Sequence, residues 1–227
     1  MISRILFFMS SLLVAAAIFF FWASPWSPVI PHRARQKVLQ GDVAAAVEML
    51  RWRAEHAFQE DVRQESLWEA AQLATLRISD TSVGISLLEE CLELPGFPYE
   101  SQAHSQLAAL LSPTDPEDAI RHWTAAIAAE PDHPEAPKWR VRVANGHESL
   151  GNIEQAISAW ELASVHERFE VPAHLALGRL QLQKDPADAL RHFTAIKDDA
   201  YIERARSAEL GEQLARWQME RRKLSGE

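Results

Sequence analysis

Nine histidines are the residues of this 227-residue chain best suited to metal binding or acid–base chemistry. His104 and His174 stand 70 positions apart, and His122 and His192 have the same spacing. The segments 99–125 and 169–195 that contain them align without a gap and are identical at 13 of 27 positions. Each of these four histidines therefore has a counterpart in a second copy of one structural module, and the copies are two repeats apart. With neighbouring helices about 8–10 Å apart, equivalent positions lie roughly 20 Å apart. A metal ion shared between the copies is excluded.

The remaining sequence motifs do not favour an enzyme. HExxH, CxxC, GxSxG and glycine-rich phosphate-binding patterns are absent from the chain. The neighbouring carboxylates Glu89 and Glu90 are typical of a solvated helix face, and the acidic stretch 130–135 of a turn. The single cysteine, Cys91, excludes a disulfide framework and is interpreted as a small buried apolar residue. We predict no catalytic residue, no metal, no cofactor and no small-molecule substrate.

Composition indicates a globular protein that does not bind nucleic acid. Hydrophobic residues make up 47% of the chain and charged residues 24%, which suffices for a continuous core in one or two domains. The formal net charge is −9, and lysines and arginines are mostly dispersed along the sequence. Nucleic-acid binding needs a cluster of basic side chains against phosphates, so that function is excluded.

Five short motifs predict the elements that position these residues. Each has a small residue, an aliphatic residue next to it and a large apolar residue four positions after the first, at Ala46/Val47/Leu50, Gly84/Ile85/Leu88, Ala119/Ile120/Trp123, Ala156/Ile157/Trp160 and Ala189/Leu190/Phe193. Helix-start signals precede them at Asp42, Asp80, Asp115, Asn152 and Asp185. Apolar residues elsewhere also follow helical spacing, so the body is predicted to be all helix, in pairs of about 34 residues.

This pattern resembles the tetratricopeptide-repeat (TPR) family over residues 32–198. The second-helix pattern matches well at Ala119, Trp123, Ala126 and Pro131, whereas the first-helix pattern is degraded, with Trp68 as the best match to the family's tryptophan. The resemblance implies a right-handed, all-α solenoid of about five helical hairpins, and it leaves open whether the first repeat is complete. Residues 199–227 are predicted to form a capping helix and tail.

The capping helix is expected to cover the exposed end of the repeat array with its apolar side. The side chains expected on that side are Tyr201, Ile202, Ala205, Ala208, Leu214 and Trp217. Gly211 is expected to break or bend this helix.

The N-terminal region predicts a membrane anchor. Residues 5–23 contain no charged side chain and are long enough for a helix that crosses a bilayer. Bulky residues next to the only plausible cleavage site at Ala23 favour an uncleaved span, preceded by a flank at 1–4 and followed by a proline-rich spacer at 24–31. Balanced basic residues leave the orientation open. We expect a body on the periplasmic side of a bacterial inner membrane, with a cytosolic body as the alternative.

The repeat register places six polar residues on the inner surface that such hairpins form. These partner-binding candidates are Glu69, His104, Asn145, Glu148, His174 and Gln181. The lysine and asparagine clamp that chaperone-binding relatives use for a terminal carboxylate is replaced here by Glu69 with Leu73 and by His104 with Ala108. The resemblance therefore implies a membrane-anchored adaptor or scaffold that binds another kind of protein partner and assists assembly or chaperoning in the envelope. The alternatives are a self-assembling structural membrane protein and an accessory subunit of a cytochrome-maturation or translocation complex.

Overall fold

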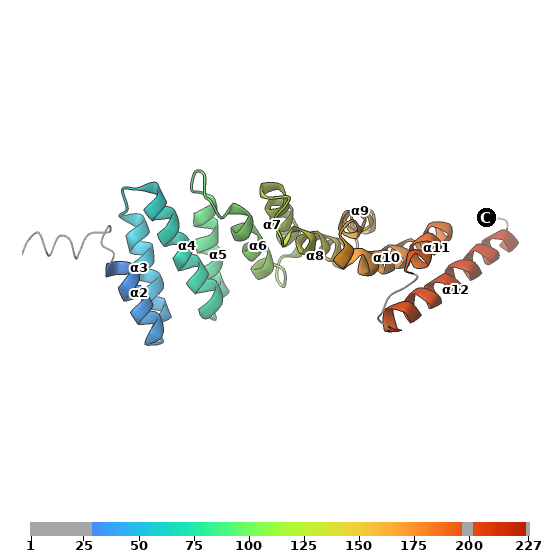
Figure 1. Ribbon diagram of the computed structural model, residues 1–227, viewed down its shortest axis with the longest axis horizontal. Coiled ribbons are helices and arrows are strands. Elements are labelled where there is room, and N and C mark those ends of the chain that lie inside the picture. The colour runs from blue at the N-terminus through green and yellow to red at the C-terminus, as the bar shows by residue number, and fades with distance from the viewer. Residues whose placement is uncertain (1–28, 197–201, 226–227) are drawn as a thin grey trace, which may run out of the picture. The chain divides into compact units, whose positions relative to one another are not determined.

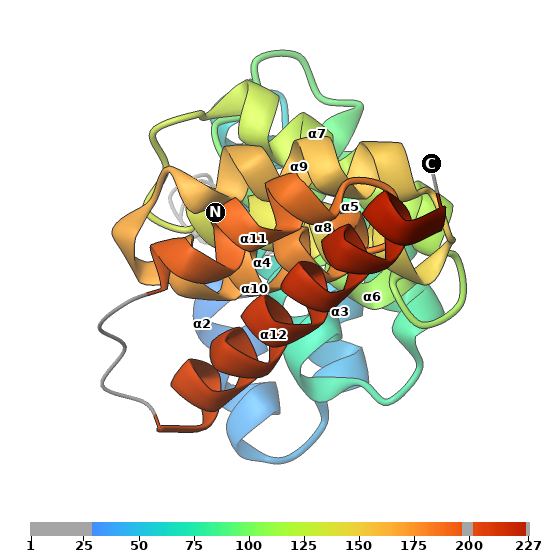
Figure 2. The same cartoon turned by 90° about the vertical axis from the view of Figure 1, so that its right-hand side faces the viewer.

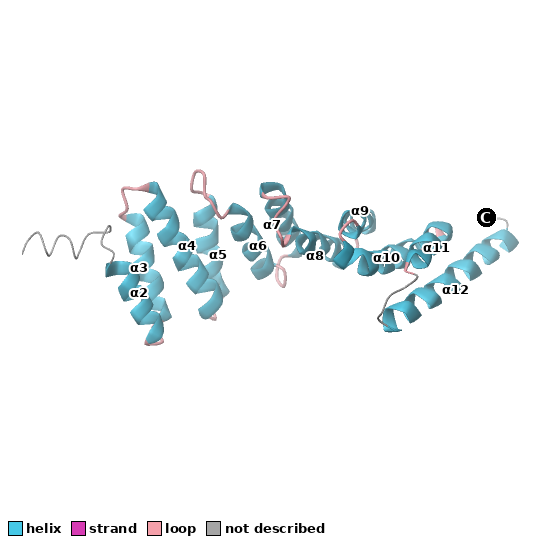
Figure 3. Cartoon of the chain, viewed as in Figure 1, coloured by secondary structure: helices cyan, strands magenta, loops and turns pink. Residues whose placement is uncertain are grey.

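The computed structural model describes residues 29–196 and 202–225, and all secondary structure in these ranges is helical (Figure 3). Figure 1 labels the helices in chain order. Their bounds are α2 Val29–Leu39, α3 Val43–Glu55, α4 Glu60–Arg77, α5 Thr81–Leu92, α6 Glu100–Leu111, α7 Pro116–Ala129, α8 Ala136–Ser149, α9 Ile153–Ser164, α10 Glu167–Gln181, α11 Pro186–Ala195 and α12 Ile202–Ser225. The prediction of an all-helical body is confirmed for the described residues.

The predicted starts of the second helices are confirmed at the residue level. Asp42, Asp80, Asp115, Asn152 and Asp185 are the N-cap residues of α3, α5, α7, α9 and α11. The four aspartates accept hydrogen bonds from first-turn amides of their helices. These amides have no partner within a helix, so a short acidic side chain at this position favours helix initiation.

The chain divides into two compact units, and the first comprises residues 1–103. Its described part contains α2 to α5 and the beginning of α6, with successive helices from α2 to α5 packed against each other. Leu50, Leu87, Leu88 and Cys91 are fully buried. Burial raises the pKa of the Cys91 thiol to about 12, so this side chain is an inert part of the core, as predicted.

Two contacts in the first unit show how the matched residues Trp68 and Gly84 pack. Trp68 stacks on Tyr99, with ring centroids 5.2 Å apart, so the segment between α5 and α6 folds back onto α4. A Cβ at Gly84 would lie 2.9 Å from Thr75 Cγ2, which shows how closely α5 approaches α4. The small residue of the motif is therefore required by close packing between helices.

The second unit comprises residues 104–227, so the division falls within α6. Successive helices from α7 to α12 pack against each other. Its core contains Trp123, Trp139, Trp160, Leu177 and Phe193. The large residue of each motif thus lies in the interior, and the stretch 130–135 forms the α7–α8 turn as predicted.

Helix α12 covers α11 and the adjoining part of α10 within this unit, as the end view in Figure 2 shows. The residues it buries are small ones, Ala208, Gly211 and Ala215. Leu214 and Trp217 are about half exposed, at 49% and 54%, so their predicted covering role is wrong. The helix is continuous through Gly211, so of the predicted break or bend the break does not occur.

Gly211 instead permits a close approach between two helices. A Cβ on this residue would lie 2.5 Å from the ring of Phe193 on α11. The glycine is needed for contact, and a helix tolerates it at a cost of about 1 kcal/mol relative to alanine.

Of the predicted N-terminal segments, the structure describes only the last part of the proline-rich spacer. The span at 5–23 and its flank at 1–4 lie outside the described residues, as do Tyr201 and most of the proline-rich spacer. Helix α2 begins at Val29, so the last three residues assigned to that spacer are helical, because proline is tolerated in the first turn. Within the described residues, no helix combines the length and the hydropathy needed to cross a membrane.

Candidate functional site

The structure pairs the repeated histidines within each hairpin. His104 on α6 and His122 on α7 approach with their Nδ1 atoms 2.9 Å apart. His174 on α10 and His192 on α11 do the same at 3.0 Å. The two rings are tilted by 38° in the first pair and by 37° in the second. Each pair is therefore an N–H···N hydrogen bond that joins the two helices of one hairpin.

The repeat spacing does not predict this pairing. The 70-residue offset relates His104 to His174, which are two repeats apart and too distant to share a ligand. The spacing of the histidines from the turn nevertheless indicates the pairing, because the two helices of a hairpin are antiparallel and are joined by one short turn. His104 and His174 lie eleven residues before the N-cap of the next helix, and His122 and His192 lie seven residues after it.

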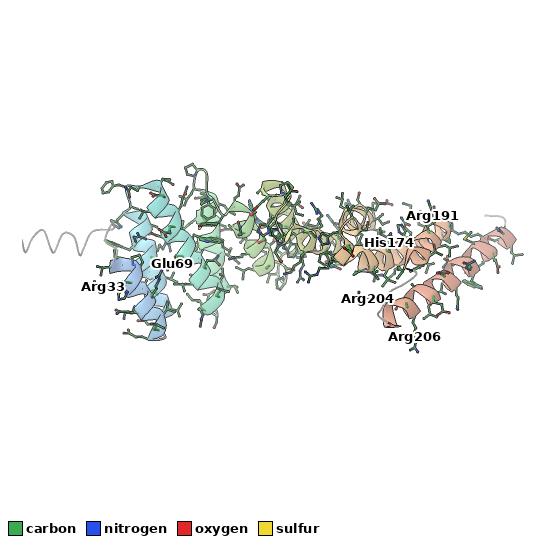
Figure 4. All side chains as sticks on the ribbon, viewed as in Figure 1. Arg33, Glu69, His174, Arg191, Arg204 and Arg206 are labelled. Atoms are coloured by element: carbon green, nitrogen blue, oxygen red, sulfur yellow. The ribbon has the colours of Figure 1, made fainter. Side chains whose placement is uncertain are left out.

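A carboxylate accompanies each pair on the second helix. Asp118 Oδ1 lies 3.7 Å from His122 Nε2, and Asp188 Oδ2 lies 3.7 Å from His192 Nε2. Arg121 and Arg191, which are mostly exposed, form ion pairs with the same two carboxylates. Figure 4 labels Arg191 and His174 on the neighbouring helices α11 and α10. The whole set of His, Asp, Arg and His is thus built twice in one unit.

The environment of His192 disfavours its protonated form. Its side chain is only 18% exposed, and burial is the largest cause that lowers its pKa. The Asp188 carboxylate opposes this effect, while His174 and Arg191 add to it and Glu161 on α9 opposes it more weakly. The neutral form of His192 is therefore favoured at neutral pH.

These pairs are not complete metal sites. Structural zinc sites use four protein ligands and catalytic sites use three. In the described part of the chain, no group of three or more His, Cys, Asp or Glu side chains is arranged to hold a metal ion. Asp118 and Asp188 lie 3.7 Å from the far nitrogen of the ring, so neither adds a ligand beside Nδ1.

The other predicted partner-binding residues have different surroundings. Glu69 on α4 is paired with Arg35 at 3.8 Å. Asn145 on α8 is exposed and donates to the Val141 carbonyl one turn earlier. Both remain accessible to a partner, although the structure does not test that role.

Glu148 is held by contacts within the fold, and Gln181 is buried. Glu148 accepts a hydrogen bond from Trp160 Nε1 at 2.9 Å and is ion-paired with Arg179, so it links α8, α9 and α10. Gln181 is buried at the end of α10, and its side-chain oxygen has no hydrogen-bond partner among the described residues. Five of the six candidates therefore have partners within the fold, across neighbouring helices for Glu69, His104, His174 and Glu148 and within α8 for Asn145, while Gln181 is buried.

Comparison with known proteins supports the fold. No family model matches the chain, and no curated protein matches its sequence. Among solved structures, a MamA double mutant (MamA RS-1 ArsTM) is similar with a TM-score of 0.55 and 20% identity, over 79% of this chain and 94% of that one. MamA residues 41 to the end from Desulfovibrio magneticus RS-1 are similar with a TM-score of 0.53 and 20% identity, over the same shares.

A further MamA crystal structure has a TM-score of 0.55 and 17% identity, over 82% of this chain and 91% of that chain. These neighbours are TPR-like helical solenoids, and at this level of identity the likeness concerns the fold alone. Together with the five helical hairpins and their caps, it shows that this chain has a TPR-type, all-helical solenoid fold.

Proposed function

We propose that this protein is a membrane-anchored adaptor whose helical hairpins bind a protein partner and hold it near a bilayer. The TPR-type fold is the observation that supports this proposal, because stacked hairpins present a long, regular surface and bind proteins in many unrelated contexts. The uncharged stretch 5–23 is the basis for the anchor. Anchoring raises the local concentration of a partner, so a weak interaction would suffice.

Photocrosslinking in native membranes tests the adaptor role. A crosslinker at Asn145, which is exposed on the first helix of the fourth hairpin, is expected to capture one specific protein. The matched control is Ser158, which is exposed on the second helix of the same hairpin. Equal capture from both positions, or none from Asn145 or Glu69, would contradict binding through the first helices.

The orientation is a separate part of the proposal. We place the body on the periplasmic side of a bacterial inner membrane. A cysteine introduced at Ser158 should then react with a membrane-impermeant maleimide in intact spheroplasts, whereas the buried Cys91 provides an unreactive background. Reaction only after the membrane is broken would place the body in the cytosol.

A self-assembling scaffold is the second candidate, and one surface favours it. Leu210, Leu214 and Trp217 form a stripe along the exposed side of α12, with 60%, 49% and 54% of each residue accessible. An exposed apolar stripe on a helix is typical of a surface that pairs with another protein. Light scattering of the detergent-solubilised full chain separates the two functions, because an adaptor is expected to stay monomeric and a self-assembling scaffold to gain mass with concentration.

A further inference from the structure

The His174–His192 pair lies next to the contact that holds α12 on the rest of its unit. Phe193 directly follows His192, and its ring fills the space beside Gly178 on α10 and Gly211 on α12. A Cβ would approach the ring to 2.6 Å at Gly178 and to 2.5 Å at Gly211. Any movement of α11 away from α10 at His192 therefore shifts the ring on which α12 rests.

An N–H···N bond between two imidazoles tolerates at most one extra proton. One Nδ1 donates its hydrogen, and the other must keep its lone pair to accept it. When both rings are protonated, the acceptor is lost and two cations face each other across the 3.0 Å Nδ1–Nδ1 distance. The contact then changes from an attraction between α10 and α11 into a repulsion.

The charges around the pair determine the sign of the pH dependence. Asp188 and Arg191 act on His192 from α11, and Glu161 acts from α9. On the other packed helices, Glu148 of α8 is neutralised by Arg179 of α10, and Glu212 of α12 by Arg216. The net result is a lowered pKa of His192, so the unfolded or opened state binds its proton more tightly than the closed state.

The attachment of α12 is built from small contacts. Its buried residues Ala208, Gly211 and Ala215 remove little apolar surface from water, so the docking free energy per turn is modest. Arg222 adds hydrogen bonds to the carbonyls of Gln183 and Lys184 in the turn between α10 and α11. A helix that approaches one aromatic ring this closely is sensitive to displacement of that ring.

We propose that protonation of both His174 and His192 opens the α10–α11 hairpin and releases α12, so that this end of the protein is a proton-sensitive cap. Release uncovers Phe193 and the partly buried apolar residues packed with it, Leu175, Leu182 and Leu190. In the closed state these side chains belong to a cluster that Ala215 of α12 completes. The His104–His122 pair has the same chemistry but lies two hairpins away in sequence, and it serves as an internal reference.

Hydrogen exchange of the full chain in detergent micelles tests this inference. The measured quantity is the opening constant of amides in residues 202–225 between pH 8 and pH 5, corrected for the intrinsic exchange rate. The opening constant is expected to rise as the pH falls below about 6.5, by up to about tenfold per pH unit for each proton taken up. In the double variant His174→Gln with His192→Ala, it should no longer depend on pH in this range. The matched control, His104→Gln with His122→Ala, should keep the wild-type dependence.

A third variant protects the test against a misfolded double variant. Asp188→Asn removes the carboxylate that favours the protonated ring in the closed state, so the pKa difference between the open and closed states widens and the ratio of the opening constants at pH 5 and pH 8 should exceed the wild-type ratio. If the double variant leaves α12 open at pH 8, the Asp188→Asn ratio decides, and a ratio equal to or below the wild-type ratio overturns the proposal. An opening constant that is equal at pH 8 and pH 5 in the wild type, or a wild-type slope in the folded double variant, also overturns it.

Discussion

The hairpins α8–α9 and α10–α11 solve the same packing problem with different side chains. Three residues after the small residue of the motif, α11 carries His192 and α9 carries Ala159, which is buried with Trp160. The α8–α9 hairpin is linked by Trp160 donating to Glu148, whereas α10–α11 is linked by two imidazoles. Both hairpins fold, so a histidine pair is not needed for the architecture. The pair is an addition that makes one hairpin sensitive to protons.

Removing the large residue of the α11 motif is expected to have the largest effect. Phe193→Ala should lower the free energy of unfolding by about 3–5 kcal/mol, because the ring is 5% exposed and fills the space between two glycines. Urea denaturation followed by circular dichroism measures this loss. A loss below about 1 kcal/mol would mean that the surroundings collapse around the deleted ring.

Filling the close approach should have the next largest effect. Gly211→Ala places a methyl group 2.5 Å from the Phe193 ring and is expected to cost about 1–3 kcal/mol despite the better helix propensity of alanine. The control is Glu209→Ala on the exposed side of the same helix, with an expected change within about 0.5 kcal/mol. Equal effects of both substitutions on the urea midpoint would show that α12 is not closely packed on α11.

The pH dependence of stability distinguishes the two hairpins directly. Because the pKa of His192 is lowered in the folded state, its neutral form stabilises the fold fully above about pH 6.5, and this stabilisation is lost as the pH falls towards the folded-state pKa. His192→Ala, which copies Ala159 of α9, should reduce the slope of unfolding free energy against pH between about 6.5 and 5. An unchanged slope in urea titrations would assign the acid sensitivity to other groups.

The link in the α8–α9 hairpin is expected to be the weakest of these contacts. Glu148→Gln keeps an acceptor for Trp160 but removes the charge that pairs with Arg179, whose side chain is 65% exposed. The expected loss is about 0.5–1 kcal/mol, falling at high salt. Thermal unfolding at low and high ionic strength measures it, and a loss that does not depend on salt would point to the hydrogen bond instead of the charge.

Local sequence signals predicted the helices well and the terminal helix less well. Asp115 and Asp185 marked helix starts correctly because an N-cap depends only on the residue and its nearest amides. In α12 the apolar periodicity suggested that Leu214 and Trp217 are buried, whereas small residues face α11. A helix with two apolar sides can dock through either side, and the shape of the neighbouring helix determines which side is buried.

The candidate site was also predicted only in part, because its contacts depend on the packing of neighbouring helices. The 70-residue offset identified His104 and His174 as repeated residues that packing does not require. It did not reveal that each pairs with a histidine of its own hairpin, and it gave no sign that Glu148 and Gln181 are occupied by the fold. Which side chains meet depends on the rotation of one helix against the next.

The sequence by itself determined the all-helical architecture, the hairpin repeat and the helix starts, because these follow from contacts within one turn or from the spacing of apolar residues. Only the tertiary structure decided that His174 Nδ1 meets His192 Nδ1, and that Phe193 lies between Gly178 and Gly211. Such contacts join residues on different helices, and a shift of one helix by a fraction of a turn would replace them. Their geometry is therefore a property of packing, in which close-packed side chains admit a single arrangement.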